Sequence, residues 1–262
     1  MRASLPLAAL ALSISAPAHA RLDASSFAAL AFHQHPGAQL PLSVPLRDES
    51  GRTATLGSTF DGRPTVLVLE YLRCQNLCSL VLSGATGALA RANLTPGKDV
   101  NLVAVSIDPR DTAADAAASR AMYSRRFPQA EAAAGGIRFL TGAPDQVARV
   151  ADAVGFPYRL DRQSDQYAHP AGFIVATPGG RISRYVLGLN PSPSLLRQAV
   201  AAAAADEVEP PAHPLLCLCF GYDPDEGSVA ALTWRLVRWA SLLIALACAM
   251  LIGSLALRRR VA

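Results

Sequence analysis

The chain has 262 residues, a formal net charge of +4 and a hydrophobic content of 51%. This length is enough for one good hydrophobic core, with shorter segments left over at either end. Arginine supplies nearly all of the positive charge, since Lys98 is the only lysine, and no basic stripe with interleaved aromatic residues is present. We therefore expect no nucleic-acid partner.

The first 20 residues have the pattern of a secretory signal peptide. Arg2 is followed by an apolar run over Leu5–Ile14 and then by Ala18-His19-Ala20, a small-residue cleavage motif. An uncleaved membrane anchor is the alternative, but the apolar run is short for a helix that spans a bilayer. We assign residues 1–20 to a signal peptide and expect the mature chain to begin near Arg21.

The other end of the chain predicts a transmembrane helix over residues 234–257. Residues 239–257 carry no charge, Trp234 and Trp239 fit interfacial positions, and three arginines follow at 258–260. Positive residues stay on the cytoplasmic side, so residues 258–262 are expected to be a cytoplasmic tail. Both ends then predict a bacterial inner-membrane protein with a single C-terminal span and its main domain in the periplasm, an oxidising compartment.

Between these ends, segments with the periodicity of strands alternate with segments typical of helices. Residues 44–56 predict a hairpin with its turn at 49–51. Thr65–Tyr71 is rich in large apolar and β-branched residues, which is typical of a buried strand. The segments that follow predict a helix at 85–92, a strand at 100–107, a helix at 113–127, a strand at 137–140, a helix at 144–154, a small strand or extended loop at 156–160, a strand pair at 172–176 and 182–186, and a helix at 194–205.

Strands that alternate with helices indicate a parallel βαβ core, to which the closing hairpin and helix add an antiparallel edge. We therefore predict an α/β protein. Residues 21–204 are expected to have a thioredoxin-like fold with an N-terminal β-hairpin, and a C-terminal transmembrane helix is expected beyond them. Residues 205–233 are expected to be a linker with a cysteine-rich segment that ends in Tyr222-Asp223-Pro224.

Cys74 and Cys78 fall between the Thr65–Tyr71 strand and the helix after it. Backbone N–H groups at a helix start favour negative charge and so stabilise a thiolate. Residues four apart lie about one turn apart on one helix face, which permits either a disulfide or two sulfur ligands to one soft metal ion. Two sulfurs leave a Cu(I)-type ion short of a third ligand, and imidazole suits copper. His169, just before another apolar strand, is the candidate.

Two further groups contain residue types that bind metals. His33 and His35 form a His-x-His pair, although such pairs are more often solvated polar sequence ahead of a turn. Cys217, Cys219 and His213 could form a second Cu(I) site close to the membrane; the alternative is a pair of lipid-facing or partly buried thiols. The phosphate-binding loop, zinc-protease and hydrolase-nucleophile motifs are all missing from the sequence.

Several motifs together resemble the Sco/SenC family over roughly residues 37–204. They are the cysteine pair, Val105–Thr112 with its Ser-x-Asp-Pro element, His169 within Ala168–Phe173, and Phe32–Leu42 near the start of the domain. The tail is similar to a bacterial subgroup with a Cys-aromatic-x-Tyr-Asp-Pro element before a C-terminal membrane helix. The family usually has proline where Gln75 stands, and often another where Ser79 stands. We therefore expect the same ligand set, but take neither the loop rigidity nor the redox poise from the resemblance.

The resemblance implies a thioredoxin fold that binds copper, as Cu(I) or Cu(II), through Cys74, Cys78 and His169, with the cysteines also forming a redox pair. It implies a copper chaperone, not an enzyme in the usual sense, that serves the CuA site of cytochrome c oxidase subunit II or a related copper enzyme. It also implies a structural role for Asp108. Two enzyme alternatives stay open: a thiol–disulfide oxidoreductase that keeps partner cysteines reduced, and, more remotely, a peroxiredoxin-like peroxidase.

Overall fold

The computed structural model describes residues 30–73, 78–125, 127, 136–162, 165–212, 239 and 241. The expected signal peptide, Cys74, His213, Cys217, Cys219 and nearly all of the expected transmembrane helix lie outside the described residues. Among the helices that are described, none combines the length and the hydropathy needed to cross a bilayer.

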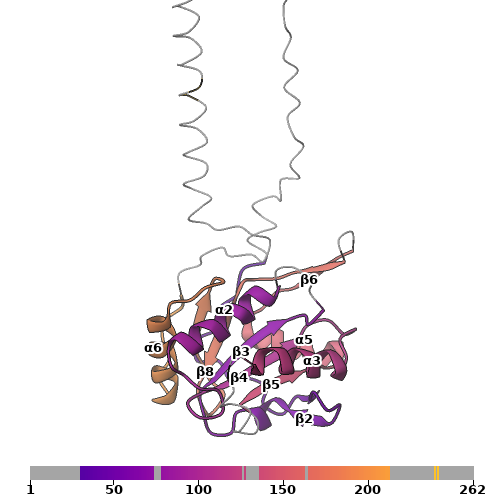
Figure 1. Cartoon of the computed structure of the whole chain (residues 1–262), viewed down its shortest axis with the longest axis horizontal. Helices are drawn as coiled ribbons and strands as arrows, with labels where there is room; N and C mark the ends of the chain where they lie inside the picture. Colours follow the sequence, from indigo (N-terminus) through magenta and orange to yellow (C-terminus); the bar gives the residue numbers. More distant parts are fainter. Residues whose placement is uncertain are drawn as a thin grey trace, which may run out of the picture.

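A five-stranded sheet forms the centre of the molecule (Figure 1). Its strands run in the order β5-β4-β3-β8-β9, with β3, β4 and β5 parallel and with β8 and β9 each antiparallel to its neighbour. The bounds are β3 Thr65–Glu70, β4 Asn101–Ser106, β5 Ile137–Leu140, β8 Gly172–Ala176 and β9 Ile182–Leu187. The mixed sheet confirms the expected parallel core with an antiparallel edge.

In the described part of the chain, the helices that flank the sheet are α2 Cys78–Arg91, α3 Ala113–Ser124, α5 Pro144–Val154 and α6 Pro193–Ala204. The α2 helix begins well before the expected residue 85, because Val81 and Leu82 already belong to its buried face. Local chemistry fixes the start of α3, where the hydroxyl of Thr112 accepts from the backbone of Asp115 and the Asp115 carboxylate accepts from the backbone of Thr112.

The sheet separates two hydrophobic cores, because successive side chains of a strand point to opposite faces. On one face, Val66 and Val68 of β3 pack with α2, α3 and α6. On the other face, Leu67 and Leu69 pack with α5 and with the N-terminal part of the domain. All six residues of β3 are buried, which explains why this strand lacks polar alternation.

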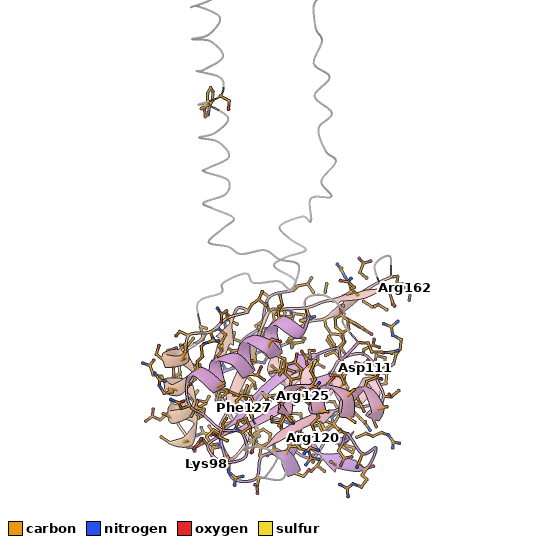
Figure 2. The ribbon with its side chains drawn as sticks, viewed as in Figure 1. Lys98, Asp111, Arg120, Arg125, Phe127 and Arg162 are labelled. Atoms are coloured by element: carbon orange, nitrogen blue, oxygen red, sulfur yellow. The ribbon has the colours of Figure 1, made fainter. Side chains whose placement is uncertain are left out.

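Two small hairpins extend this core. The first joins β1 (Pro45–Arg47) to β2 (Thr53–Thr55), as expected, and a short 3-10 helix (Leu56–Thr59) follows it. The second joins β6 (Arg159–Asp161) to β7 (Gln166–Ala168), and Arg162 lies at its far end (Figure 2). The sequence left residues 156–160 undecided and did not predict β7, because the strands of this hairpin are too short to show a period.

The two ends of the described domain lie against each other. We call residues 30–42 the N-terminal strap and residues 205–212 the C-terminal segment. Gln34 donates to the carbonyl of Ala212 at 2.7 Å and accepts from its N–H at 2.8 Å. Earlier in the C-terminal segment, the N–H of Glu209 donates to the carbonyl of Ser183 in β9 at 2.9 Å. Residues 205–212 of the expected linker are therefore packed on the domain.

Candidate metal centre

The fold brings His169 to the edge of the sheet at which the cysteine segment begins. Because β3 and β8 pair antiparallel, with Leu67 opposite Ile174, the chain leaves β3 at the edge where it arrives at β8. Tyr71 follows β3 and His169 precedes β8, and their rings meet edge to face at 6.2 Å between centroids. Residues far apart in sequence thus meet near the start of the cysteine segment.

His169 is buried and held in one orientation. Its exposed fraction is 1%, and its ring stacks on Phe156 at a centroid distance of 5.4 Å. Nδ1 lies 2.9 Å from the carbonyl oxygen of Pro170. A carbonyl only accepts hydrogen bonds, so Nδ1 must carry the proton. In this tautomer of the neutral ring the lone pair is on Nε2, and Nε2 therefore carries no proton and is able to bind a metal ion.

The cysteines are located only in part. Cys74 lies outside the described residues, and Cys78 is the first residue of α2. A cysteine at a helix start is where the helix dipole stabilises a thiolate. Within the described part of the chain, no group of three or more His, Cys, Asp or Glu side chains could hold a metal ion. The predicted set of Cys74, Cys78 and His169 therefore stays a prediction.

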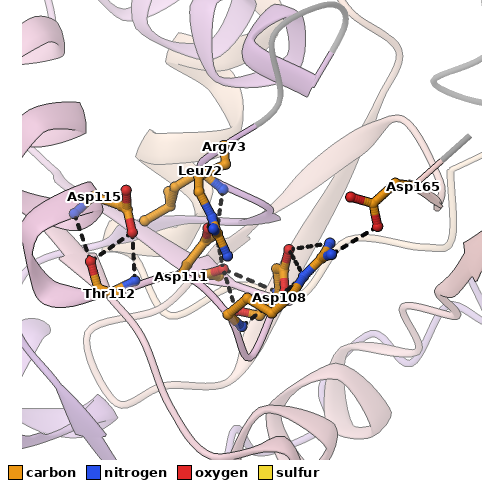
Figure 3. A network of polar contacts seen from close by, with 9 residues as sticks. Leu72, Arg73, Asp108, Asp111, Thr112, Asp115 and Asp165 are labelled. Carbon is orange, nitrogen blue, oxygen red and sulfur yellow. Dashed lines mark hydrogen bonds and ion pairs between the residues drawn. The ribbon is translucent and has the colours of Figure 1, made fainter.

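Asp111 fixes the chain directly before the cysteine segment, and sequence reasoning missed it. Its Oδ2 accepts from the N–H of Leu72 and from the hydroxyl of Ser106, each at 2.6 Å, and its Oδ1 accepts from Nε of Arg73 at 2.9 Å (Figure 3). This carboxylate has no exposed surface. An acidic residue just after the Ser-x-Asp-Pro element, at the end of a parallel strand next to β3, was the available signal.

Asp108 and Arg110 connect the same turn to the β6–β7 hairpin. Arg110 donates to both carboxylate oxygens of Asp108, with its Nη2–Oδ2 distance at 2.8 Å, and its Nη1 reaches Asp165 at 2.8 Å (Figure 3). Burial alone would raise the pKa of Asp108, but the hydrogen bonds from Arg110 and the nearby positive charges outweigh burial and lower it. The contacts agree with a structural role for Asp108, on the turn that contacts the hairpin leading to His169.

Several aromatic side chains pack together at this edge of the sheet. Tyr167 packs against Tyr71 at 5.5 Å and against Tyr158 at 6.1 Å between ring centroids. Burial is the main cause that raises the pKa of both Tyr158 and Tyr167. Phe156 and Tyr71 contact His169, and Tyr167 and Tyr158 extend this largely apolar wall from Tyr71. Such a wall limits access of water to a bound ion.

The model of the SCO1/SenC family matches residues 45–205, which is more than half of the chain. The chain belongs to the SCO1/SenC family. No curated protein sequence matches it significantly. The expected family is thereby confirmed, while the C-terminally anchored subgroup stays a prediction.

Solved structures share this fold at low sequence identity. A putative electron transfer protein from Aquifex aeolicus VF5 is 22% identical, with a TM-score of 0.57 over 65% of this chain and 95% of the other. ScoI of Arabidopsis thaliana, solved with copper bound, is 20% identical, with a TM-score of 0.51 over 66% and 98%. BsSco, from the Sco family of cytochrome c oxidase assembly proteins and described with a disulfide switch, is 18% identical, with a TM-score of 0.50 over 66% and 97%. The expected α/β thioredoxin-like fold is confirmed for the described domain.

Proposed function

We propose that the protein is a membrane-anchored periplasmic copper chaperone. It holds copper as cargo through Cys74, Cys78 and His169, and it delivers the ion to the CuA site of cytochrome c oxidase subunit II, reduces the thiols of that site, or does both. The observation that carries the proposal is the setting of His169, which is buried, has Nδ1 bonded to a carbonyl and lies next to the residues that precede Cys74.

The residue types fit copper. Two thiolates and one imidazole suit Cu(I), and imidazole also suits Cu(II). The bond between Nδ1 of His169 and the Pro170 carbonyl is the outer contact that orients a metal-binding histidine. Membership of the SCO1/SenC family and the copper-bound relative from Arabidopsis thaliana support the same metal. The periplasmic location and the membrane anchor rest on the two hydrophobic ends of the sequence.

A second candidate function is a thiol–disulfide oxidoreductase that keeps partner cysteines reduced without delivering copper. The start of α2 at Cys78 favours it, because a helix N-terminus stabilises the thiolate that attacks a disulfide. This function needs Cys74 and Cys78 but not His169. The two candidates therefore differ in what replacement of His169 does.

A Cu(I) titration of the reduced full chain against a competing chelator tests the proposal. We expect one tightly bound Cu(I) per chain, strong weakening in His169→Ala, and wild-type affinity in Asp61→Asn, a control at an exposed position. Disulfide reductase activity should persist in His169→Ala. Failure of the wild-type chain to bind Cu(I) tightly would overturn copper delivery and leave the oxidoreductase.

A further inference from the structure

The N-terminal strap presents two histidines that the proposed copper centre does not use. His33 and His35 are both exposed. Neither imidazole has a hydrogen bond or ion pair among the described residues. The backbone between them is nevertheless fixed, since the N–H of His33 donates to the carbonyl of Gly155 at 2.8 Å and the N–H of His35 donates to the hydroxyl of Tyr185 at 2.9 Å.

The spacing and exposure of the two histidines are those expected for side chains on one side of an extended strap. Alternate residues of an extended chain share a side, and His35 precedes Pro36, which favours the extended backbone. The pattern of exposure agrees, because Gln34 between them is half-buried and bonds the C-terminal segment at Ala212. In extended backbone, residues two apart are separated by about 6.6 Å, so both imidazoles can reach one ion.

We propose that His33 and His35 form a second metal site, which takes a divalent transition-metal ion and Cu²⁺ in preference to Zn²⁺. Imidazole is a good ligand for Cu²⁺, Ni²⁺ and Zn²⁺, and Cu²⁺ binds most strongly in this series. The described residues supply only these two ligands, since they contain no group of three or more metal-binding side chains. The remaining coordination positions take water or an incoming ligand. Such a site binds more weakly than the thiolate centre.

The position of this pair gives the second site a use. Phe32, the residue before His33, contacts Phe156 edge to face at 5.4 Å between centroids, and Phe156 also stacks on the ring of His169 at 5.4 Å. The carbonyl that accepts from His33 belongs to Gly155, the neighbour of Phe156 in the chain. The strap pair is therefore linked, through Phe32 and Phe156, to the aromatic wall next to His169. We assign the pair the role of a loading site for the copper centre. This role rests on the proposed copper function, whereas the binding of a metal ion by the pair is independent of that function.

The test measures Cu²⁺ binding to the full chain in a background that lacks the proposed thiolate centre. This background replaces His169 by Ala and all five cysteines by Ser, so that no thiol reduces or holds the ion. We expect one Cu²⁺ per chain by equilibrium dialysis, with nitrogen hyperfine splitting from two imidazoles in the electron paramagnetic resonance spectrum. Addition of His33→Ala and His35→Ala should abolish both signals, and Zn²⁺ should compete only in excess.

His213→Ala in the same background is the matched control. Gln34, between the two histidines, bonds the C-terminal segment at Ala212. Alternation along an extended strap puts His33 and His35 on the side opposite Gln34, so this variant should keep the ion. Retention of Cu²⁺ after loss of both strap histidines, or loss of Cu²⁺ in the His213 control, overturns the proposal. The background has no thiolate centre, so either result is independent of the Cu(I) titration that tests the proposed function.

Discussion

Asp111 fixes the path of the chain directly before the cysteine segment. One buried carboxylate holds the backbone of Leu72, the guanidinium of Arg73 and the hydroxyl of Ser106. Hydrogen bonds to charged groups contribute about 1.5–3 kcal/mol each to stability, more than neutral ones. These contacts therefore tie the residues before Cys74 to the end of β4.

Asp111→Asn is expected to weaken Cu(I) binding by about 10–100-fold, the usual effect of removing a residue that orients metal ligands. Asparagine keeps a similar shape but loses the charge that Arg73 contacts, and its amide presents donors where Leu72 and Ser106 also donate. The measurement is a Cu(I) competition titration, together with urea unfolding of the same variant. Asp61→Asn, at an exposed position, is the control. Wild-type affinity in Asp111→Asn would contradict the positioning role.

Asp108→Asn is expected to lower the free energy of unfolding near neutral pH by about 1–3 kcal/mol, and to flatten its decline in acid. Folding lowers the pKa of Asp108 because hydrogen bonds and charge from Arg110 outweigh the opposing effect of burial. The paired carboxylate therefore stabilises the protein above its unfolded pKa of ~3.9, and this contribution is lost as the pH falls through the folded pKa. Urea unfolding as a function of pH measures this contribution. Parallel curves of unfolding free energy against pH for the wild type and the variant would contradict the prediction.

At the scale of elements, α2 is placed by a close approach to the loop after β9. A Cβ on Gly84 would lie 1.7 Å from the carbonyl oxygen of Leu189, a backbone atom. Glycine in a helix interior costs roughly 1 kcal/mol relative to alanine. Helix propensity therefore favours alanine at position 84, whereas the close approach of Leu189 requires glycine. The helix starts at Cys78, and any displacement of α2 also displaces that cysteine.

Gly84→Ala is expected to destabilise the protein by about 1–3 kcal/mol, the usual cost of overpacking. Gly87→Ala in the same helix is the matched control, because its Cβ would meet only the flexible end of Arg91 at 3.1 Å. That variant should gain up to roughly 1 kcal/mol from helix propensity. Thermal and urea unfolding decide between them. If both variants change stability in the same direction, the contact with Leu189 does not constrain α2.

For the whole molecule, the chain stays packed on the domain over residues 205–212, after α6 ends at Ala204. The C-terminal segment returns along β9, where Arg184 pairs with Glu209 at 2.6 Å and the Ser183 hydroxyl donates to the carbonyl of Glu207 at 2.7 Å. It then meets the N-terminal strap at Gln34. Chain leaving this domain toward the predicted membrane helix therefore starts from a fixed point next to the strap.

A chain that ends after Ala204 is expected to be less stable than one that ends after Ala212, by about 2–4 kcal/mol if each lost hydrogen bond contributes roughly 1 kcal/mol. The comparison uses urea unfolding of the two truncated chains. The variant Gln34→Ala in the longer chain should show a smaller part of the same loss. Equal unfolding midpoints for the two chains would mean that the C-terminal segment adds nothing to the fold.

Local composition was sufficient to predict the strands of the central sheet, the helices and the β1–β2 hairpin. The candidates Cys74, Cys78 and His169 came from the combination of motifs, and their joint role stays a prediction. Buried strands are continuous apolar runs and helices space their apolar residues by three or four, so both can be recognised in the local sequence. Only the tertiary structure decided which residues meet. The antiparallel pairing of β3 with β8 brings His169 to Tyr71, and the turn after β4 brings Asp111 to Leu72. Contacts between segments distant in sequence depend on strand order, and strand order leaves no pattern within either segment.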